Sequence, residues 1–123
     1  MKNKIFPLII IILLIVLNSC KMESDPTYGI WIDRVTYSQF SSVFGPLSDN
    51  TLTKITLTDS QFNSLSLPSN QRRTWTSDDI YKWFYNDMFL TSAQSSDLRS
   101  FMVNTKHCIV AIRTGGFVDM IYK

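Results

Sequence analysis

The sequence is poor in the side chains that most enzymes and metal sites use. Its 123 residues include one histidine, His107, and two cysteines, Cys20 and Cys108. A zinc site needs three or four histidine, cysteine or carboxylate ligands at short spacings, so this set predicts no metal site. Glycine is also scarce, with four residues, and none of them belongs to a phosphate-binding loop or to the Gly-x-Ser-x-Gly turn of serine hydrolases. We therefore expect no cofactor and assign no catalytic residue.

A Cys-His nucleophilic pair is the one catalytic arrangement that the scarce residues suggest, because His107 and Cys108 are neighbours in the chain. Adjacent residues of a strand point to opposite faces of the sheet, so a nucleophile and a base at these positions cannot meet. Cys108 is followed by the apolar run Ile109 to Ile112. We expect it to be a small buried side chain rather than a reactive thiol.

Net charge is low as well. The chain has 12 basic and 10 acidic residues, and two of the basic ones, Lys2 and Lys4, precede an uncharged stretch from Ile5 to Leu17. This is the layout of a secretory signal, and it is too short for a bilayer-spanning helix, which needs about 20 apolar residues. Removal of the signal would leave 10 basic and 10 acidic residues. A neutral mature chain predicts no nucleic-acid partner.

The end of the apolar stretch reads Leu17-Asn18-Ser19-Cys20, which resembles the lipobox of bacterial lipoprotein precursors. Asn18 departs from the small residue that is usual at its position. The resemblance implies that residues 1–19 are a signal peptide, that cleavage occurs before Cys20, and that the Cys20 sulfur carries lipid. Two or three acyl chains on one residue would hold the chain on a membrane, whereas a single chain binds only marginally.

Residues 20–27 form the lipidated cysteine and a short tether in this interpretation. The segment Lys21 to Asp25 contains Glu23 and Asp25, and it resembles the acidic surface-export signal of Bacteroidetes lipoproteins; a solvated linker is the equal alternative. We expect a lipid-anchored protein of the cell envelope, on the outer membrane. The sequence leaves the periplasmic and the surface face both open.

Residues 28–123 are expected to fold as one domain. Gly29 to Val35 is rich in β-branched and aromatic residues and predicts a strand. Thr36 and Gln39 follow it in the pattern of a helix capping box. The same arrangement returns 22 residues later: Val35 to Val43 and Leu57 to Leu65 share Thr, Ser, Gln, Phe and Ser. Two copies are too few for a solenoid, so they predict two similar strand-to-helix turns.

Two further helices and a hairpin complete the expected order β-α-β-α-α-α-β-β. Ser77 is the expected cap of a helix whose apolar face continues to Met88. Thr91 and Gln94 form a third capping-box pattern, which opens another helix. Gly115-Gly116 separates two apolar runs and predicts a tight hairpin. The apolar face of the first helix is expected to hold Ile80, Trp83, Phe84 and Met88, and that of the second Leu98, Phe101 and Met102. In the hairpin, the residues expected opposite each other are Thr114 with Phe117, Ile112 with Asp119, and Val110 with Ile121. These elements define an α+β domain with a mixed or antiparallel sheet of about four strands and three to four helices.

The segment Ser66 to Thr76 has the composition of an exposed loop. It brings Arg72 and Arg73 close to Trp75, and arginine and tryptophan dominate many binding hot spots. We interpret these three residues as a candidate partner-binding surface, with packing of Trp75 onto the next helix as the alternative.

The function expected from these features is a non-enzymatic binding or accessory module, of the envelope-assembly, inhibitor or immunity type, with a protein or a glycan as its partner. The alternative is a small envelope hydrolase that uses carboxylates or a serine together with His107. Candidate carboxylates are spread along the chain and no pair stands out: Asp33, Asp49, Asp59, Asp97 and Asp119.

Overall fold

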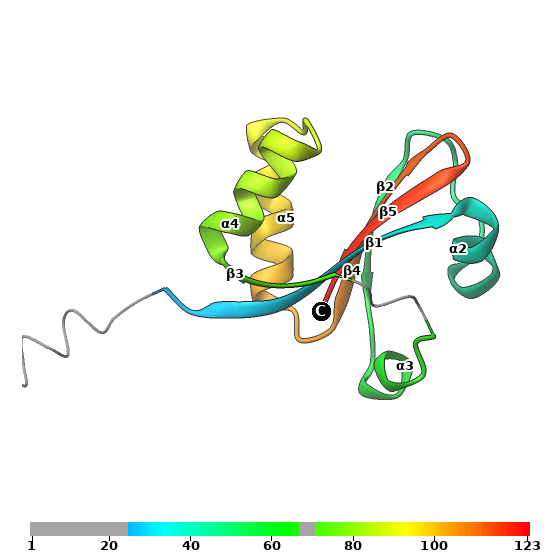
Figure 1. The fold of residues 1–123 in the computed structure, drawn as a ribbon, viewed down its shortest axis with the longest axis horizontal. Coiled ribbons are helices and arrows are strands. Elements are labelled where there is room, and N and C mark those ends of the chain that lie inside the picture. Colours follow the sequence, from blue (N-terminus) through cyan, green and yellow to red (C-terminus); the bar gives the residue numbers. More distant parts are fainter. Residues whose placement is uncertain (1–24, 67–70) are drawn as a thin grey trace, which may run out of the picture.

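A computed structural model describes residues 25–66 and 71–123 of the chain (Figure 1). The signal peptide, Cys20 and most of the expected tether lie outside the described residues, as do four residues of the expected loop, 67–70. The predictions about them stay predictions. Within the described residues, no helix is long and apolar enough to cross a bilayer.

The described residues form an α+β fold around one five-stranded antiparallel sheet. The strand order is β2-β4-β5-β1-β3. The strands are β1 (Thr27–Thr36), β2 (Leu52–Thr56), β3 (Arg72–Thr76), β4 (Cys108–Thr114) and β5 (Phe117–Tyr122). The α+β class is therefore confirmed, and the expected order lacks one strand, β3.

Helices cover both faces of this sheet (Figure 1). One face carries α4 (Ser77–Lys82), which runs on into a π-helical turn, η1 (Trp83–Asp87), and then α5 (Ser92–Asn104); we call it the α5 face. The other face carries α2 (Tyr37–Phe44) and α3 (Asp59–Asn63); we call it the α2 face.

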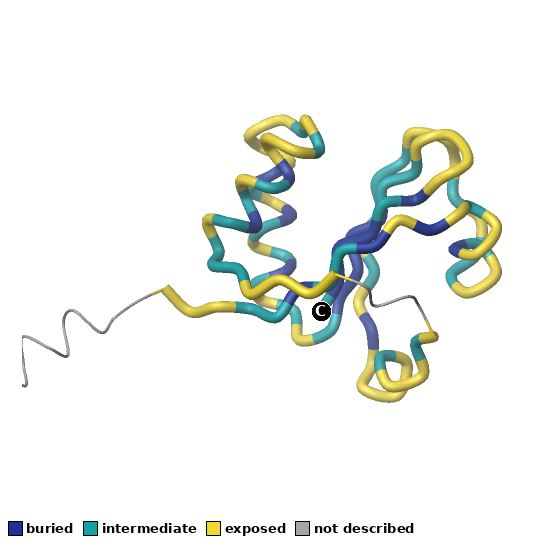
Figure 2. The backbone as a smooth tube through the Cα atoms, in the orientation of Figure 1, coloured by how far each residue is buried: buried dark blue, intermediate teal, exposed yellow. Residues whose placement is uncertain are grey.

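Each face has its own apolar core, because successive side chains of a strand alternate between the two sides of a sheet. The α5-face core is built from Ile30, Ile80, Phe84, Leu98, Met102, Cys108, Val110 and Ile121. The α2-face core is built from Val35, Phe40, Leu57, Ile109, Ala111, Val118, Met120 and Tyr122. The buried segments meet at the centre of the sheet in Figure 2. The stripe of Leu98, Phe101 and Met102 on α5 is confirmed, with Phe101 at its edge.

The C-terminal hairpin has the predicted register. Thr114 lies opposite Phe117, and the two other predicted pairs, Ile112 with Asp119 and Val110 with Ile121, are present. Gly115 has a φ of 62°, a left-handed conformation that glycine adopts without steric cost. β4 lies between β2 and β5, which agrees with the apolar residues on both of its faces.

The three predicted capping boxes are present. In the box of α2, the Gln39 N–H donates to Thr36 Oγ1 at 3.2 Å and the Thr36 N–H donates to Gln39 Oε1 at 3.0 Å. Thr58 caps α3 and Thr91 caps α5 in the same way. The two similar sequence segments thus form two similar strand-to-helix turns, and both helices cover the α2 face.

The prediction for α4 was wrong by one residue, because Thr76 rather than Ser77 is its cap. The Asp79 N–H donates to Thr76 Oγ1 at 3.2 Å, and the Thr76 N–H donates to Asp79 Oδ2 at 2.9 Å. The hydrogen bonds from Thr76 lower the pKa of Asp79. An aspartate at the third position of the helix therefore replaces the Glu or Gln of the usual box.

One other expectation is corrected. The expected loop from Ser66 to Thr76 ends in a strand, because Arg72–Thr76 pairs with β1. β1 also extends beyond the expected strand, Gly29 to Val35, at both ends.

Candidate functional site

His107 and Cys108 lie on opposite sides of the sheet, as predicted. Cys108 is fully buried in the α5-face core, and burial raises the pKa of its thiol to about 11. The His107 ring stacks on Phe62 of α3, with ring centroids 3.9 Å apart, and its Nε2 lies 3.2 Å from Asp59 Oδ1. The thiol is therefore held in its neutral, weakly nucleophilic form, and the imidazole packs α3 against the sheet.

The carboxylates that a hydrolase would use are engaged in structural contacts. Five aspartates form ion pairs with cations: Asp49 with Arg113, Asp59 with Lys106, Asp78 with Lys82, Asp97 with Lys54, and Asp119 with Arg34. The Lys106 ammonium, by hydrogen bonding and by its charge, lowers the pKa of Asp59. Asp33 is buried and accepts a hydrogen bond from the Tyr122 hydroxyl. Within residues 25–66 and 71–123, no three His, Cys, Asp or Glu side chains gather as a metal site would require.

The three residues of the predicted partner-binding surface lie on β3, at one edge of the sheet. Trp75 is half-buried and packs against Trp83, with ring centroids 6.1 Å apart. The Arg72 guanidinium lies 5.9 Å from the centroid of the Trp31 ring. The Arg73 side chain is exposed and forms no ion pair or hydrogen bond with another described side chain. The structure thus leaves the two arginines, rather than the indole, on the surface.

The register of β3 shows which backbone groups its open edge presents. The Ile32 N–H donates to the Gln71 carbonyl oxygen at 2.9 Å, so these two residues form a hydrogen-bonded pair. Hydrogen-bonded and non-hydrogen-bonded pairs alternate along an antiparallel ladder. Arg73 therefore turns its backbone N–H and C=O toward β1, whereas Arg72 and Thr74 point theirs away from the sheet.

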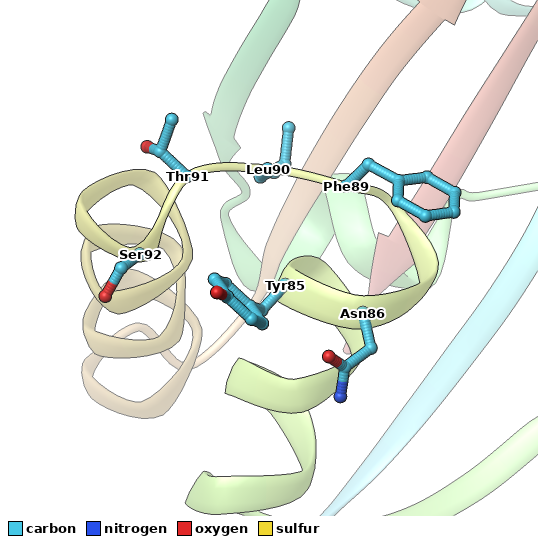
Figure 3. Close-up of a pocket in the computed structure, with 6 residues that line it drawn as sticks. All are labelled: Tyr85, Asn86, Phe89, Leu90, Thr91 and Ser92. Atoms are coloured by element: carbon cyan, nitrogen blue, oxygen red, sulfur yellow. The ribbon is translucent and has the colours of Figure 1, made fainter.

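A second surface feature was not predicted: the turn between η1 and α5, whose tip is Phe89. The Phe89 side chain is 88% exposed, and its backbone has a φ of 55°. It lies beside the exposed Tyr85 at a shallow pocket of about 580 Å³, lined by Tyr85, Asn86, Phe89, Leu90, Thr91 and Ser92 (Figure 3). In this view the Phe89 ring projects outward from the turn, away from Tyr85. We call residues 85–90 the aromatic tip.

The sequence carried a weak signal for the aromatic tip. Met88, Phe89 and Leu90 are three consecutive apolar residues just before the cap Thr91. Consecutive apolar residues in a connection between two helices have no helical face to share, so at least one is expected to be exposed. Nothing in the sequence indicates that Phe89 is that residue.

A further apolar groove of about 450 Å³ lies between α2 and α3. Its walls come from the two similar turns and from β2, and they are Val43, Phe44, Ile55, Leu57, Gln61, Ser64 and Leu65. Val43 is half-exposed at its rim. No charged side chain is among these wall residues, so they include no group that would orient a ligand electrostatically.

Comparison of the chain with protein-family models, with curated proteins and with solved structures gave no match. Function therefore has to be inferred from the surfaces themselves.

Proposed function

We propose that the chain is a non-enzymatic binding module of the cell envelope, held on a membrane by lipid on Cys20, and that its partner binds at the open edge of β3. The observation that carries this proposal is the state of Arg72 and Arg73. Five other cations of the described residues pair with carboxylates. The guanidinium groups of Arg72 and Arg73, like the cations of Arg99 and Lys123, pair with no carboxylate of the described residues, and these two arginines are consecutive on a strand at the edge of the sheet.

The partner that this edge suits is an extended protein segment that carries carboxylates. Arg72 and Thr74 offer backbone donors and acceptors to an added strand, which is a common way for a sheet to bind a peptide. Arg72 and Arg73 point to opposite faces of the sheet, so each can reach a carboxylate on one side of that strand. A bidentate arginine–carboxylate contact is among the stronger polar interactions available at an interface.

The start of β1, where the proposed tether would end, lies beside this edge. Thr27, the first residue of β1, is the register partner of Thr76 at the end of β3, and the tether begins directly before β1. A lipid on Cys20 would therefore hold β3 near the membrane surface, within the few residues of the tether.

Charge reversal tests the proposal. The mature lipoprotein is cross-linked in its own cells, and recovered partners are quantified by mass spectrometry for the wild type, Arg73→Glu and Lys106→Glu. Both variants change an exposed cation into an anion, but Lys106 lies beside Asp59, away from β3. We expect Arg73→Glu to lose roughly tenfold or more of a partner that Lys106→Glu retains, because a like charge opposes the carboxylates. Equal recovery in both variants, with unchanged unfolding temperatures, would exclude the β3 edge.

A further inference from the structure

Two backbone irregularities coincide at the aromatic tip. The helix that begins at Ser77 ends as a π-helix, Trp83–Asp87. Such turns are rare in proteins, and many of those that occur lie at functional sites. Two residues on, Phe89 adopts a left-handed conformation. The other non-glycine residue with positive φ in the described part of the chain is Asn50, a residue type that tolerates this region. A bulky aromatic residue there is a true outlier.

This unfavourable conformation gives Phe89 no place in either core. Its ring is 88% exposed and projects from the turn (Figure 3). Strained backbone persists at positions where it serves a function more often than elsewhere. The turn therefore exposes an aromatic side chain, and packing inside the domain does not offset the free-energy cost of the left-handed backbone at Phe89.

The chemistry of the tip is apolar and nearly uncharged. Met88, Phe89 and Leu90 are consecutive, and Asp87 is the one charged residue from Trp83 to Thr91. Uncharged polar side chains surround the apolar residues in the pocket, namely Asn86, Thr91 and Ser92. Aromatic rings with uncharged polar neighbours suit the boundary between water and the acyl chains of a bilayer. The absence of lysine and arginine in this stretch does not favour an anionic lipid surface.

The length of chain before the domain brings a bilayer within reach of the tip. From Cys20 to Thr27 the extended chain spans roughly 25 Å at about 3.5 Å per residue. Thr27 lies opposite Thr76, and the 11 residues of α4 and η1 extend from there by roughly 16 Å at 1.5 Å per residue. The distance from the start of β1 to the tip is thus shorter than the full length of the tether. A weak contact becomes effective when a tether holds its two sides at a high local concentration.

We propose that the aromatic tip inserts Phe89 into the interface of the same bilayer that holds the lipid of Cys20, and that its ligand is a zwitterionic phospholipid surface. This inference rests on the proposed lipid anchor. Together the two contacts fix how the domain stands on the membrane, with the end of η1 against the lipid and β3 beside the tether. A protein pocket that accepts Phe89 is the other outcome that the test can return.

An environment-sensitive dye near the tip tests the inference. Asn86→Cys is labelled with a nitrobenzoxadiazole group in the lipidated mature chain, which is reconstituted on phosphatidylcholine vesicles. Cys108 will not compete for the label, because it is fully buried and its pKa is raised to about 11. The matched control carries the same dye at Val43→Cys, which is 52% exposed on the α2 face.

We expect the dye at residue 86 to gain roughly threefold or more in emission and to be quenched by spin-labelled lipid, since it would move from water into the interface. The dye at residue 43, at the rim of the apolar groove, should show the same emission with and without vesicles. Adding Phe89→Ser to the protein labelled at residue 86 should abolish the gain. This second variant shows that Phe89, and not the dye, drives insertion.

Three results would overturn the inference. Water-like emission at residue 86 from a chain that floats with the vesicles would leave the anchor intact and exclude insertion of the tip. A labelled chain that does not float with the vesicles would exclude the lipid anchor, and the inference that rests on it would be excluded as well. A dye that stays exposed to water on vesicles but becomes shielded when envelope proteins are added would show that the tip binds a protein rather than the lipid surface.

Discussion

The hydroxyl of Tyr122 on β5 donates a hydrogen bond of 2.5 Å to Asp33 Oδ2 on β1. The two residues are 89 positions apart in the sequence and both are buried. A hydroxyl that donates to a carboxylate makes a short, charge-assisted hydrogen bond. This contact joins two neighbouring strands on the α2 face, so a polar pair contributes to the stability of a largely apolar core.

Replacement of Tyr122 by Phe should therefore destabilise the domain. The variant keeps the ring and removes the donor, and a buried hydrogen bond to a charged group contributes about 1.5–3 kcal/mol. The free energy of unfolding in urea measures the loss. An unchanged urea midpoint would show that Asp33 does not depend on this hydroxyl.

The capping residue of α5, Thr91, should also contribute to the free energy of unfolding. Thr91→Ala removes the acceptor for the Gln94 N–H, which lies 3.1 Å from Thr91 Oγ1. We expect a loss of about 1 kcal/mol in the free energy of unfolding. Ser100→Ala is the matched control, because Ser100 is exposed in the interior of the same helix and alanine is the better helix former there. Equal effects of the two variants would contradict the role of the cap.

Phe89→Asn should raise stability rather than lower it. Asparagine tolerates the left-handed conformation that Phe89 adopts with a φ of 55°, and an 88% exposed ring contributes little burial. We expect a gain of about 1 kcal/mol from relief of backbone strain, which is the low end of the usual cost of such strain. Thermal unfolding of the soluble domain checks this, and a clear fall in the unfolding temperature would show that the ring stabilises the fold.

Cys108 should make the fold less stable at alkaline pH. Burial raises the pKa of its thiol from 9.0 to about 11, so the folded chain holds this proton more tightly than the unfolded chain does. Stability from this group is present below pH 9 and falls as the pH rises toward 11. Lys123 opposes the effect, because burial lowers its pKa.

The comparison that isolates the thiol is therefore between the wild type and Cys108→Ala at the same pH values. Unfolding free energies measured at about pH 7, 9 and 10.5 should fall more steeply for the wild type. Parallel curves would mean that the thiol does not titrate with unfolding.

The parts of the fold that could be predicted from the sequence are those that neighbouring residues determine. The boxes of Thr36, Thr58 and Thr91 close within four residues, and the hairpin register follows from Gly115-Gly116. Separation of His107 from Cys108 needed only the alternation of a strand.

The missed features depend on contacts between distant residues. Arg72–Thr76 has no run of apolar residues, and it is a strand because β1 pairs with it. The exposure of Phe89 follows from a π-helical turn and a left-handed residue, which no local pattern in the sequence indicates. Trp75 is not one of the missed features, because packing on the next helix was one of its two predicted positions and it packs on Trp83.

The most direct test of the proposed lipid anchor is the intact mass of the chain extracted from membranes. We predict a mature N-terminus at Cys20, with the mass of residues 20–123 increased by a diacylglycerol group on the sulfur and, where the amine is acylated, by one further acyl chain. An N-terminus at any other residue, or an unmodified Cys20 thiol, would contradict the anchor and with it the membrane placement of the domain.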